Sequence, residues 1–481
     1  MNRSLILYFT GRLICIEALL MLLPMAVAFL YREDCAWAFI AVILPALLFG
    51  SIISFFFRPK NKTIYAREGF VIVVLSWLLF SAIGALPFVI SGQIPSYIDA
   101  FFETVSGFTT TGASILTDVE SMSHGLLFWR SFTHWIGGMG ILVFIVALLP
   151  GISDRSIHIL KAEMPGPIMG KLVPRLKDTA RVLYLIYIVL TLVQIVLLLA
   201  GGMSLFDSVL HTFGTAGTGG FGIKADSVGS YSPYLQWVIT IFMVIFGVNF
   251  NLYFLLLRRR IKDVMCSSEL WVYLGIVSVA TALITINILP QYKVFSDSLR
   301  HGAFQVASII TTTGYTTQNF DLWPTFSKVI LLLMMFIGAC AGSTAGGLKV
   351  SRVVILFQSI KQEFRKLLHP RSVTVVKFEG KTLDKSTLTN VKNYFALYMI
   401  CLLTIFLVIS WEPMNIETHL SAAVSCFNNV GPGLAAVGPA ASYAAYSPLS
   451  KLVLSFAMLL GRLEIFPLLL TLAPSVWVKN K

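Results

Sequence analysis

The stretch DAFFETVSGFTTTGAS, residues 99–114, decides the fold, because a related stretch, DSVLHTFGTAGTGGFG, recurs at residues 207–222. In both stretches an Asp precedes a central glycine by thirteen residues, and a short amphipathic segment lies between them. Two further relatives follow, AFQVASIITTTGYTT at 303–317 and SAAVSCFNNVGPG at 421–433. Each insert is too short to cross a bilayer, and its glycines and threonines disfavour a stable spanning helix. The chain therefore carries four internal repeats of one motif.

The composition places these repeats in a membrane. Of all residues 57% are hydrophobic and 12% are charged, and the mean hydropathy is +0.82. Too little polar surface remains to cover a water-soluble domain. Apolar stretches of about 20 residues, the length that crosses a hydrocarbon core as a helix, accompany the inserts. Clear examples are Leu13–Leu30, Phe70–Ile90, Val182–Ala200, Trp237–Leu257, Trp271–Leu289 and Tyr394–Trp411.

The net charge of +13 is gathered on one side of the bilayer. Segments 58–67, 155–181, 258–262 and 349–392, together with the two ends of the chain, hold 28 of the 36 Lys and Arg residues. The positive-inside bias assigns these segments to the cytoplasm, and their distribution argues against nucleic acid as a partner. Because each repeat starts and finishes on the cytoplasmic side, its insert must enter and leave from outside as a re-entrant pore loop.

We therefore expect an all-α membrane protein with about ten spanning helices. Four helix–pore loop–helix repeats stand in a pseudo-fourfold arrangement around a central pore, and an extra N-terminal transmembrane hairpin precedes them. The N-terminus superficially matches a signal peptide, but a second apolar stretch follows it at once and favours the hairpin. The expected units are the hairpin 1–57, the first repeat 58–152, the second repeat with its preceding cytoplasmic segment 153–257, the third repeat 258–360, and a cytoplasmic linker with the fourth repeat 361–481.

The four loops contain the residue types that a cation filter needs. A permeating cation loses hydration that backbone carbonyls in a ring can replace without binding it irreversibly. Glycine permits the dihedrals that turn successive carbonyls inward, and Thr hydroxyls add oxygens or brace the loop. The helix before each loop would point its negative C-terminal end at the cavity. Singly each loop also reads as a plain turn. The predicted ion-binding residues are Thr110, Thr111, Gly112, Thr218, Gly219, Gly220, Thr312, Thr313, Gly314, Asn429, Val430 and Gly431.

Five motifs carry a resemblance to a known family. They are NNVGPG at 428–433, TTGY at 312–315, TTTGA at 109–113, GRLEIF at 461–466 and CAGSTAGG at 340–347. Together they resemble the Trk/Ktr/HKT superfamily of potassium transporters over essentially the whole chain, and the leading hairpin is similar to the bacterial TrkH/TrkG branch. The resemblance implies K+ as the transported ion and a multi-pass protein of the bacterial cytoplasmic membrane with no covalently bound cofactor. Relatives with Ser in place of Gly112 tend to carry sodium, so this glycine favours potassium.

A dense run of small residues interrupts the second apolar stretch of the third repeat. Its members are Gly338, Gly342, Ser343, Thr344, Gly346 and Gly347. The run is read either as close helix packing or, as the resemblance implies, as an intramembrane gating loop that obstructs the pore. In the last apolar stretch Arg462 lies two positions from Glu464, where an unpaired charge is costly. Arg462 either pairs with Glu464 or, as the resemblance implies, faces the cavity and contributes to the gate.

Nucleotide sensing would need a partner chain. The glycine pattern at 217–222 lacks a flanking βαβ unit, and no Walker A motif is present. The resemblance implies a TrkA-like cytoplasmic nucleotide-binding regulatory subunit bound beneath a homodimer. The basic segments 154–181 and 361–392 are the expected docking surface, with Arg365 and Lys366 as contact residues. They also read as plain cytoplasmic loops of a protein in a lipid bilayer.

A sodium-permeable pore or a cation-coupled symporter of the same architecture is the alternative function. A coupled mechanism normally needs a titratable relay in the membrane, and we expect downhill conduction because the candidates are few. They are Glu17 near the cytoplasmic end, Glu464 beside Arg462, and the isolated His134 and His211. An inverted-repeat transporter is disfavoured because every repeat begins on the cytoplasmic side. A membrane enzyme is disfavoured because HExxH and GxSxG motifs are absent.

Overall fold

The computed structural model describes residues 2–59, 65–140, 176–372 and 374–477, and these residues are almost entirely helical. The only sheet among them is a hairpin of β1 (Lys377–Phe378) and β2 (Lys381–Thr382), which pair antiparallel with Phe378 opposite Lys381. The expected all-α architecture is confirmed.

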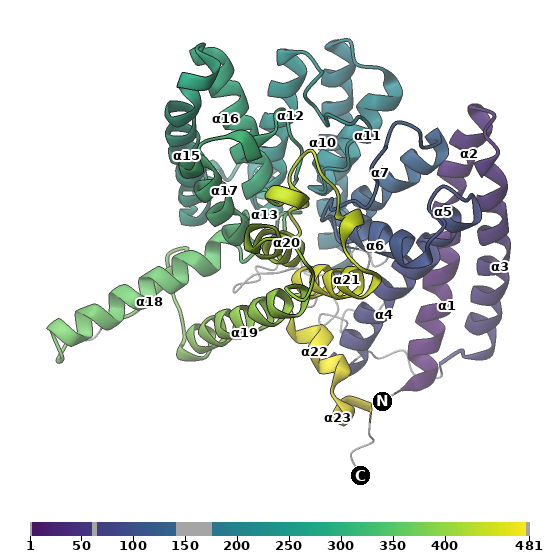
Figure 1. Cartoon of the computed structure of the whole chain (residues 1–481). Helices are drawn as coiled ribbons and strands as arrows, with labels where there is room; N and C mark the ends of the chain where they lie inside the picture. Colours follow the sequence, from purple (N-terminus) through teal and green to yellow (C-terminus); the bar gives the residue numbers. More distant parts are fainter. Residues whose placement is uncertain (1, 60–64, 141–175, 373, 478–481) are drawn as a thin grey trace.

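The N-terminal hairpin forms an outer layer on the first repeat. Helices α1 (Arg3–Leu20) and α2 (Leu22–Leu30) make one span, and α3 (Cys35–Phe56) returns beside it. The two spans approach closely at a pair of glycines, since a Cβ on Gly11 would lie 2.6 Å from the carbonyl oxygen of Gly50. Helix α1 also packs on α4, and α2 packs on α7. The hairpin is the purple group at one edge of the molecule (Figure 1).

The first two repeats share one order of elements: a long helix, a short pore helix, a loop and a second helix. The first repeat contains α4 (Ala66–Gly84), the short α5 (Leu86–Ile90), the pore helix α6 (Tyr97–Phe108) and α7 (His124–Gly138). The second contains α10 (Leu176–Ala200), the pore helix α11 (Leu205–Gly217), α12 (Pro233–Phe246), α13 (Phe250–Leu257) and the short α14 (Ile261–Met265).

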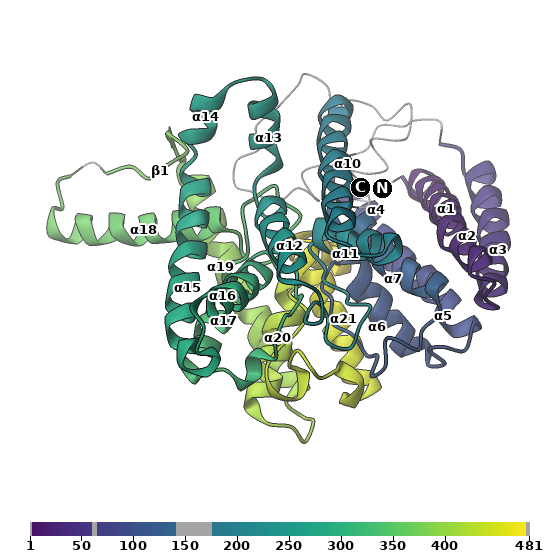
Figure 2. The same cartoon turned by 90° about the horizontal axis from the view of Figure 1, so that it is seen from above.

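The last two repeats follow the same order. The third contains α15 (Ser268–Tyr292), the pore helix α16 (Phe295–Ile310), the 3-10 turn η1 (Phe320–Leu322), α17 (Thr325–Ile337) and α18 (Val350–Leu368). The fourth contains α19 (Lys385–Ile409), the pore helix α20 (Ile416–Asn428), the turns η2 (Ala435–Val437) and η3 (Tyr443–Ala445), α21 (Pro448–Arg462), α22 (Phe466–Leu472) and α23 (Pro474–Trp477). Seen from above, the four pore helices gather around the middle of the molecule, and α18 projects away from it (Figure 2).

The described residues contain fewer long spans than the ten or so crossings expected. Six helices are long and apolar enough to cross a bilayer, and a seventh span results if α12 and α13 count as one. The other expected crossings are the second helices of the repeats. Of these, α17 has only 13 residues before a break, and α21 is followed by α22 after a break at 463–465. These helices are interrupted where the chain passes the pore loops.

The apolar stretch Trp237–Leu257 shows why such a helix breaks. Helices α12 and α13 meet at an angle of 89°. A Cβ on Gly247 would lie 2.4 Å from the hydroxyl of Tyr273, and Asn249 caps α13 by accepting a hydrogen bond from the Asn251 amide at 3.0 Å. The carbonyl of Gly247 accepts a bond from the amide of Cys340 instead of continuing the helix. The bend therefore makes room for the loop that follows α17.

The boundaries of the sequence units remain predictions. The boundary at residue 152 lies outside the described residues. The boundary at residue 257 coincides with the end of α13. The boundary at residue 360 falls inside α18, which continues to Leu368.

Candidate ion-conduction site

Capping side chains begin three of the pore helices. Ser96 accepts a hydrogen bond from the Asp99 amide, and Ser204 accepts one from the Asp207 amide at 3.0 Å. In the fourth repeat Asn415 plays the same part. Both recurring aspartates thus stand in the first turn of a pore helix, where a carboxylate suits the positive end of the helix dipole. The opposite, negative end of each pore helix leads into its loop.

All four loops have the same backbone conformation. The four glycines predicted for the filter, called here the filter glycines, have φ of 78° (Gly112), 69° (Gly220), 83° (Gly314) and 104° (Gly431). The residue two positions earlier is also left-handed in each repeat, with φ of 55° to 57°. These residues are Thr110, Thr218, Thr312 and Asn429. Left-handed backbone was expected at the glycines only, because β-branched residues seldom adopt it.

One hydrogen bond holds each loop in this conformation. In every repeat the amide just before the filter glycine donates to the carbonyl five residues earlier, at 2.8 to 2.9 Å. The four bonds are Thr111 to Ser106, Gly219 to Gly214, Thr313 to Ser308 and Val430 to Ser425. The match in four different sequences shows that these positions are structurally equivalent.

The four filter glycines form a closed cycle. A Cβ added to Gly112 would lie 2.0 Å from the carbonyl oxygen of Gly219, and one on Gly220 would lie 1.8 Å from that of Thr313. A Cβ on Gly314 would lie 2.4 Å from the carbonyl oxygen of Val430, and one on Gly431 would lie 2.6 Å from that of Thr111. Each loop thus abuts the next one, and the fourth abuts the first. A side chain at any of these positions would push two loops apart.

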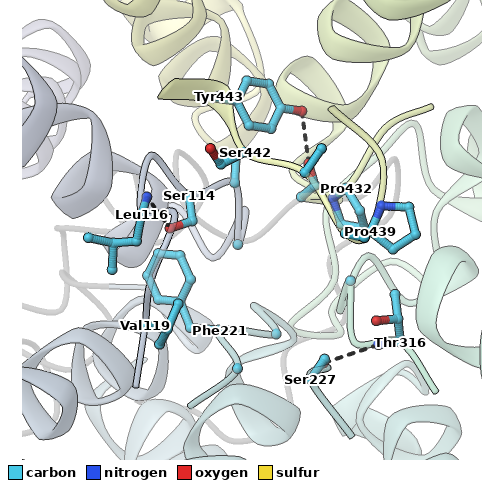
Figure 3. Close-up of a pocket in the computed structure, with 18 of the residues that line it drawn as sticks. Ser114, Leu116, Val119, Phe221, Ser227, Thr316, Pro432, Pro439, Ser442 and Tyr443 are labelled. Carbon is cyan, nitrogen blue, oxygen red and sulfur yellow. Dashed lines mark hydrogen bonds between the residues drawn. The ribbon is translucent and has the colours of Figure 1, made fainter. Parts of the chain in front are cut away.

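A single pocket contains all four of these glycines in its lining. The pocket has a volume of about 330 Å³ and is also lined by Ser114, Thr316 and Tyr443. Figure 3 shows residues of all four repeats around it, with the Tyr443 hydroxyl donating to the carbonyl of Gly431 at 2.9 Å. Four of the twelve predicted residues, the glycines of four distant segments, therefore meet at one place.

Several of the predicted hydroxyl groups brace the loops. The hydroxyls of Thr109 and Thr111 lie 2.8 Å apart, and Asn429 donates to that of Thr111 at 2.9 Å. The hydroxyl of Thr218 donates to its neighbour's carbonyl at 2.6 Å, and that of Thr312 accepts a bond from the Gly346 amide at 2.7 Å. The last bond joins the third loop to the run of small residues.

The run of small residues forms a compact loop rather than a helix contact. Helix α17 ends at Ile337, and Gly338, Gly342 and Gly347 have φ of 71° to 74°. A Cβ on Gly346 would lie 2.3 Å from the carbonyl oxygen of Asn428, at the end of the fourth pore helix. The hydroxyl of Ser343 donates to a carbonyl within the loop, and that of Thr344 donates to a carbonyl of α12. Residues 338–349, called here the gate loop after the role predicted for this segment, thus lie against the pore loops.

Arg462 connects the gate loop to the first repeat. Its guanidinium donates to the carbonyl of Thr344 at 2.7 Å and to those of Gly137 and Gly138 at 2.6 and 2.7 Å. The expected pairing with Glu464 is wrong. Glu464 instead makes a two-bond ion pair with Arg352, at 2.6 and 2.9 Å, because the chain turns sharply at residues 464 and 465, which both have positive φ.

A carboxylate that the sequence did not single out supports the gate loop. Glu269, in the first turn of α15, accepts hydrogen bonds from the amides of Ala341 at 2.7 Å and Ser351 at 3.0 Å. These amides would otherwise lack partners, which is costly inside a membrane protein. An acidic residue just inside an apolar stretch was the available sequence signal.

Glu17, His134 and His211, the candidates for a titratable relay, are all buried. Glu17 does not lie near the cytoplasmic end, since its carboxylate is buried beside Gly84 at the far end of α4. The ring of His134 stacks on Phe221 at 4.1 Å, behind the second loop, and His211 contacts the carbonyl of its own helix. The described residues contain no group of three or more His, Cys, Asp or Glu side chains that suits a metal ion.

Comparisons with known proteins agree with this arrangement. The family model TrkH, described as cation transport protein, matches residues 37–479. The Trk system potassium uptake protein TrkH of Escherichia coli strain K12 is 38% identical over 97% of this chain and 98% of that protein. TrkG of the same strain is 34% identical over 97% of each. The crystal structure of the potassium transporter TrkH from Vibrio parahaemolyticus matches with a TM-score of 0.89 and 34% identity, over 99% of this chain and 100% of that one.

Sequence and structure therefore lead to the same assignment. The match to the family model extends over nearly the whole chain, and the fold is that of a solved relative. The apolar spans make the chain a multi-pass protein of the bacterial cytoplasmic membrane. The chain belongs to the TrkH family of cation transport proteins.

Proposed function

We propose that the chain takes up K+ across the cytoplasmic membrane through the twelve-residue filter. The observation that carries the proposal is the closed cycle of Gly112, Gly220, Gly314 and Gly431, which line one pocket. Carbonyl groups around such a cycle can replace the hydration of an ion. Relatives named as Trk system potassium uptake proteins support K+ as the ion and transport, rather than catalysis, as the activity.

Rubidium flux into proteoliposomes tests the proposal. We expect K+ to compete with labelled Rb+ at equimolar concentration, and Na+ and Li+ to compete weakly. The Gly112→Ser variant should shift this order toward Na+. Equal competition by Na+ in the unmodified protein would favour the alternative, a sodium-permeable pore.

The gate loop and Arg462 form the gate beneath the filter. Support comes from the three carbonyls that Arg462 binds and from the bond between the Gly346 amide and Thr312. Arg462→Met keeps much of the side-chain length but removes these donors. We expect the basal Rb+ flux of this variant to rise, because the gate loop loses its attachment to the first repeat. Lys293→Met, at an exposed helix end, is the matched control. An unchanged flux in Arg462→Met would contradict the role of Arg462.

Conduction is downhill rather than coupled to another ion. Glu17, His134 and His211 stand on three different helices, and no hydrogen bond among the described residues joins one of these side chains to another, which supports this mechanism. The reversal potential of currents should follow the K+ gradient when the proton and sodium gradients are varied. A reversal potential that follows pH or Na+ would favour a symporter of the same architecture.

A TrkA-like nucleotide-binding subunit regulates the gate from the cytoplasm, beneath a homodimer. Arg365 and Lys366 are exposed in the last turn of α18 and offer it positive charge, whereas most of segment 154–181 lies outside the described residues. Replacing both residues with Glu should weaken co-purification with a TrkA-type subunit, whereas Lys293→Glu should not. Equal recovery with both variants would place the docking surface elsewhere.

A further inference from the structure

The four repeats differ at one buried position behind the filter. Nine residues before the filter glycine stand Glu103, His211, Gln305 and Ala422, in chain order of the repeats. Only the first repeat has a carboxylate there, and the Glu103 side chain is 1% exposed. A carboxylate buried so deeply requires a compensating charge and several hydrogen bonds.

Glu103 fixes the chain that leaves the first filter loop. One carboxylate oxygen accepts a bond from Nε of Arg130 at 2.6 Å and from the Ser114 hydroxyl at 2.9 Å. The other accepts a bond from the amide of Ile115 at 3.0 Å. Ser114 and Ile115 stand two and three residues after Gly112. The carboxylate therefore sets the direction of the backbone at the outer edge of the filter.

Arg130 extends the same network to the second repeat. Its side chain is 3% exposed, yet it belongs to the lining of the pocket that the four filter glycines share. Nη1 donates to the carbonyl of Gly222 at 2.9 Å, and the guanidinium lies 3.6 Å from the centre of the Phe221 ring. Gly222 and Phe221 follow the filter glycine Gly220. The pair therefore joins the outer ends of two neighbouring loops.

We infer that Glu103 and Arg130 are a positioning pair that sets cation selectivity at the corner between the first and second repeats. The inference rests on the proposed function. Neither side chain needs to touch the ion. Their hydrogen bonds hold the carbonyls near Gly112 and Gly220 at a fixed separation, and Glu103 neutralises a guanidinium that would otherwise repel cations entering the mouth.

A double-mutant cycle separates these roles from simple folding. The variants are Glu103→Gln, Arg130→Gln and the two combined, reconstituted as full-length protein and compared by Rb+ and Na+ flux. Glu103→Gln leaves the guanidinium charge unpaired, so we expect Rb+ flux to fall and the ratio of Rb+ to Na+ flux to fall at least about threefold. The combined variant removes both charges, and its loss should be smaller than the product of the two single losses. Arg130→Lys retains the charge but not the fork of donors, and should recover flux more than selectivity.

A second ion pair on a pore helix is the control. Glu417 in α20 pairs with Lys328 at 3.2 Å, but its side chain is 45% exposed. Glu417→Gln should therefore leave both the flux and the ratio unchanged. If the unmodified protein takes up no Rb+, the proposed function fails. The inference is overturned if the unmodified protein transports Rb+ and the Glu103 and Arg130 variants keep its ratio of Rb+ to Na+ flux. This comparison uses variants that elute from size-exclusion chromatography at the volume of the unmodified protein. If the single variants do not elute as folded protein, the ratio of Rb+ to Na+ flux of the combined variant is compared with that of the unmodified protein, and an equal ratio overturns the inference.

Discussion

At the scale of single residues, the filter depends on backbone conformations that its side chains disfavour. Thr110, Thr218 and Thr312 are β-branched and have φ of 55°, which costs roughly 1–2 kcal/mol at each position. This cost is offset by the backbone hydrogen bond that an amide of each loop donates to a carbonyl of its pore helix. Strained backbone that recurs at equivalent positions is typical of a functional site.

The filter glycines allow a test at this scale. Gly220→Ala places a methyl group 1.8 Å from the carbonyl oxygen of Thr313, on a residue with φ of 69°. We expect Rb+ flux to fall more than about tenfold, since both the dihedral cost and the clash displace loops of the filter. Gly275→Ala, with no atom within 4 Å of the added methyl and no positive φ, is the control. Equal fluxes would show that the second loop does not line the pathway.

At the scale of elements, the cytoplasmic hairpin is connected to the gate loop. Glu379 lies in the two-residue turn between β1 and β2 and accepts bonds from the hydroxyls of Ser267 and Ser268 and from the Glu269 amide, at 2.9 to 3.2 Å. It thus caps the start of α15. Because Glu269 in turn accepts hydrogen bonds from the amides of Ala341 in the gate loop and Ser351 in α18, two carboxylates link the turn of this hairpin to the gate loop.

This link predicts an effect on gating. Glu379→Gln weakens the cap by ~1 kcal/mol, since bonds to a charged acceptor exceed those to a neutral one. We expect the basal Rb+ flux to rise about fivefold, because the closed arrangement of the gate loop loses that support. Lys381→Gln, exposed in the same hairpin, should leave the flux unchanged. A flux in Glu379→Gln equal to that of the control would show that the hairpin does not act on the gate.

At the scale of the whole molecule, a carboxylate reinforces the packing of the N-terminal hairpin on the first repeat. Glu33, between α2 and α3, accepts bonds from the amides of His124 at 2.7 Å and Gly125 at 3.0 Å, at the start of α7. Burial raises the pKa of the Glu33 carboxyl, but the hydrogen bonds from Gly125 and His124 outweigh it and lower the pKa below the ordinary value of 4.5.

The attachment therefore depends on pH. A group with a lowered pKa in the folded state stabilises that state fully above its ordinary pKa and loses this contribution as the pH falls through the folded value. We expect the thermal unfolding midpoint in detergent to fall below pH 4.5. Glu33→Gln should lower the midpoint at pH 7 by an amount corresponding to about 1–2 kcal/mol and should flatten its acid dependence. An acid dependence as steep in the variant as in the unmodified protein would assign the effect to other carboxylates.

The sequence by itself determined the membrane class and the four repeats, and it predicted the glycines of the filter. These features are local. The length of an apolar stretch indicates a membrane span, and a glycine among threonines indicates a backbone with positive φ. The equivalence of the first two repeats could be found by spacing alone, from Asp99 and Gly112 in one and Asp207 and Gly220 in the other. The run of small residues at 338–347 was also visible in the sequence, but the choice between close helix packing and a loop was left to the structure, in which it forms a loop.

Only the tertiary structure decided which charges meet and in which order the loops touch. Glu464 pairs with Arg352, 112 residues away, rather than with its near neighbour Arg462. Glu103 meets Arg130, and Glu269 meets the gate loop, across separations that no periodicity reveals. The span of α12 and α13 is bent by 89° where Gly247 lies close to Tyr273 of the neighbouring helix α15. Side-chain pairing depends on which distant segments the fold brings together. In a membrane a buried charge is costly without a partner, so it pairs with the opposite charge that the fold places beside it.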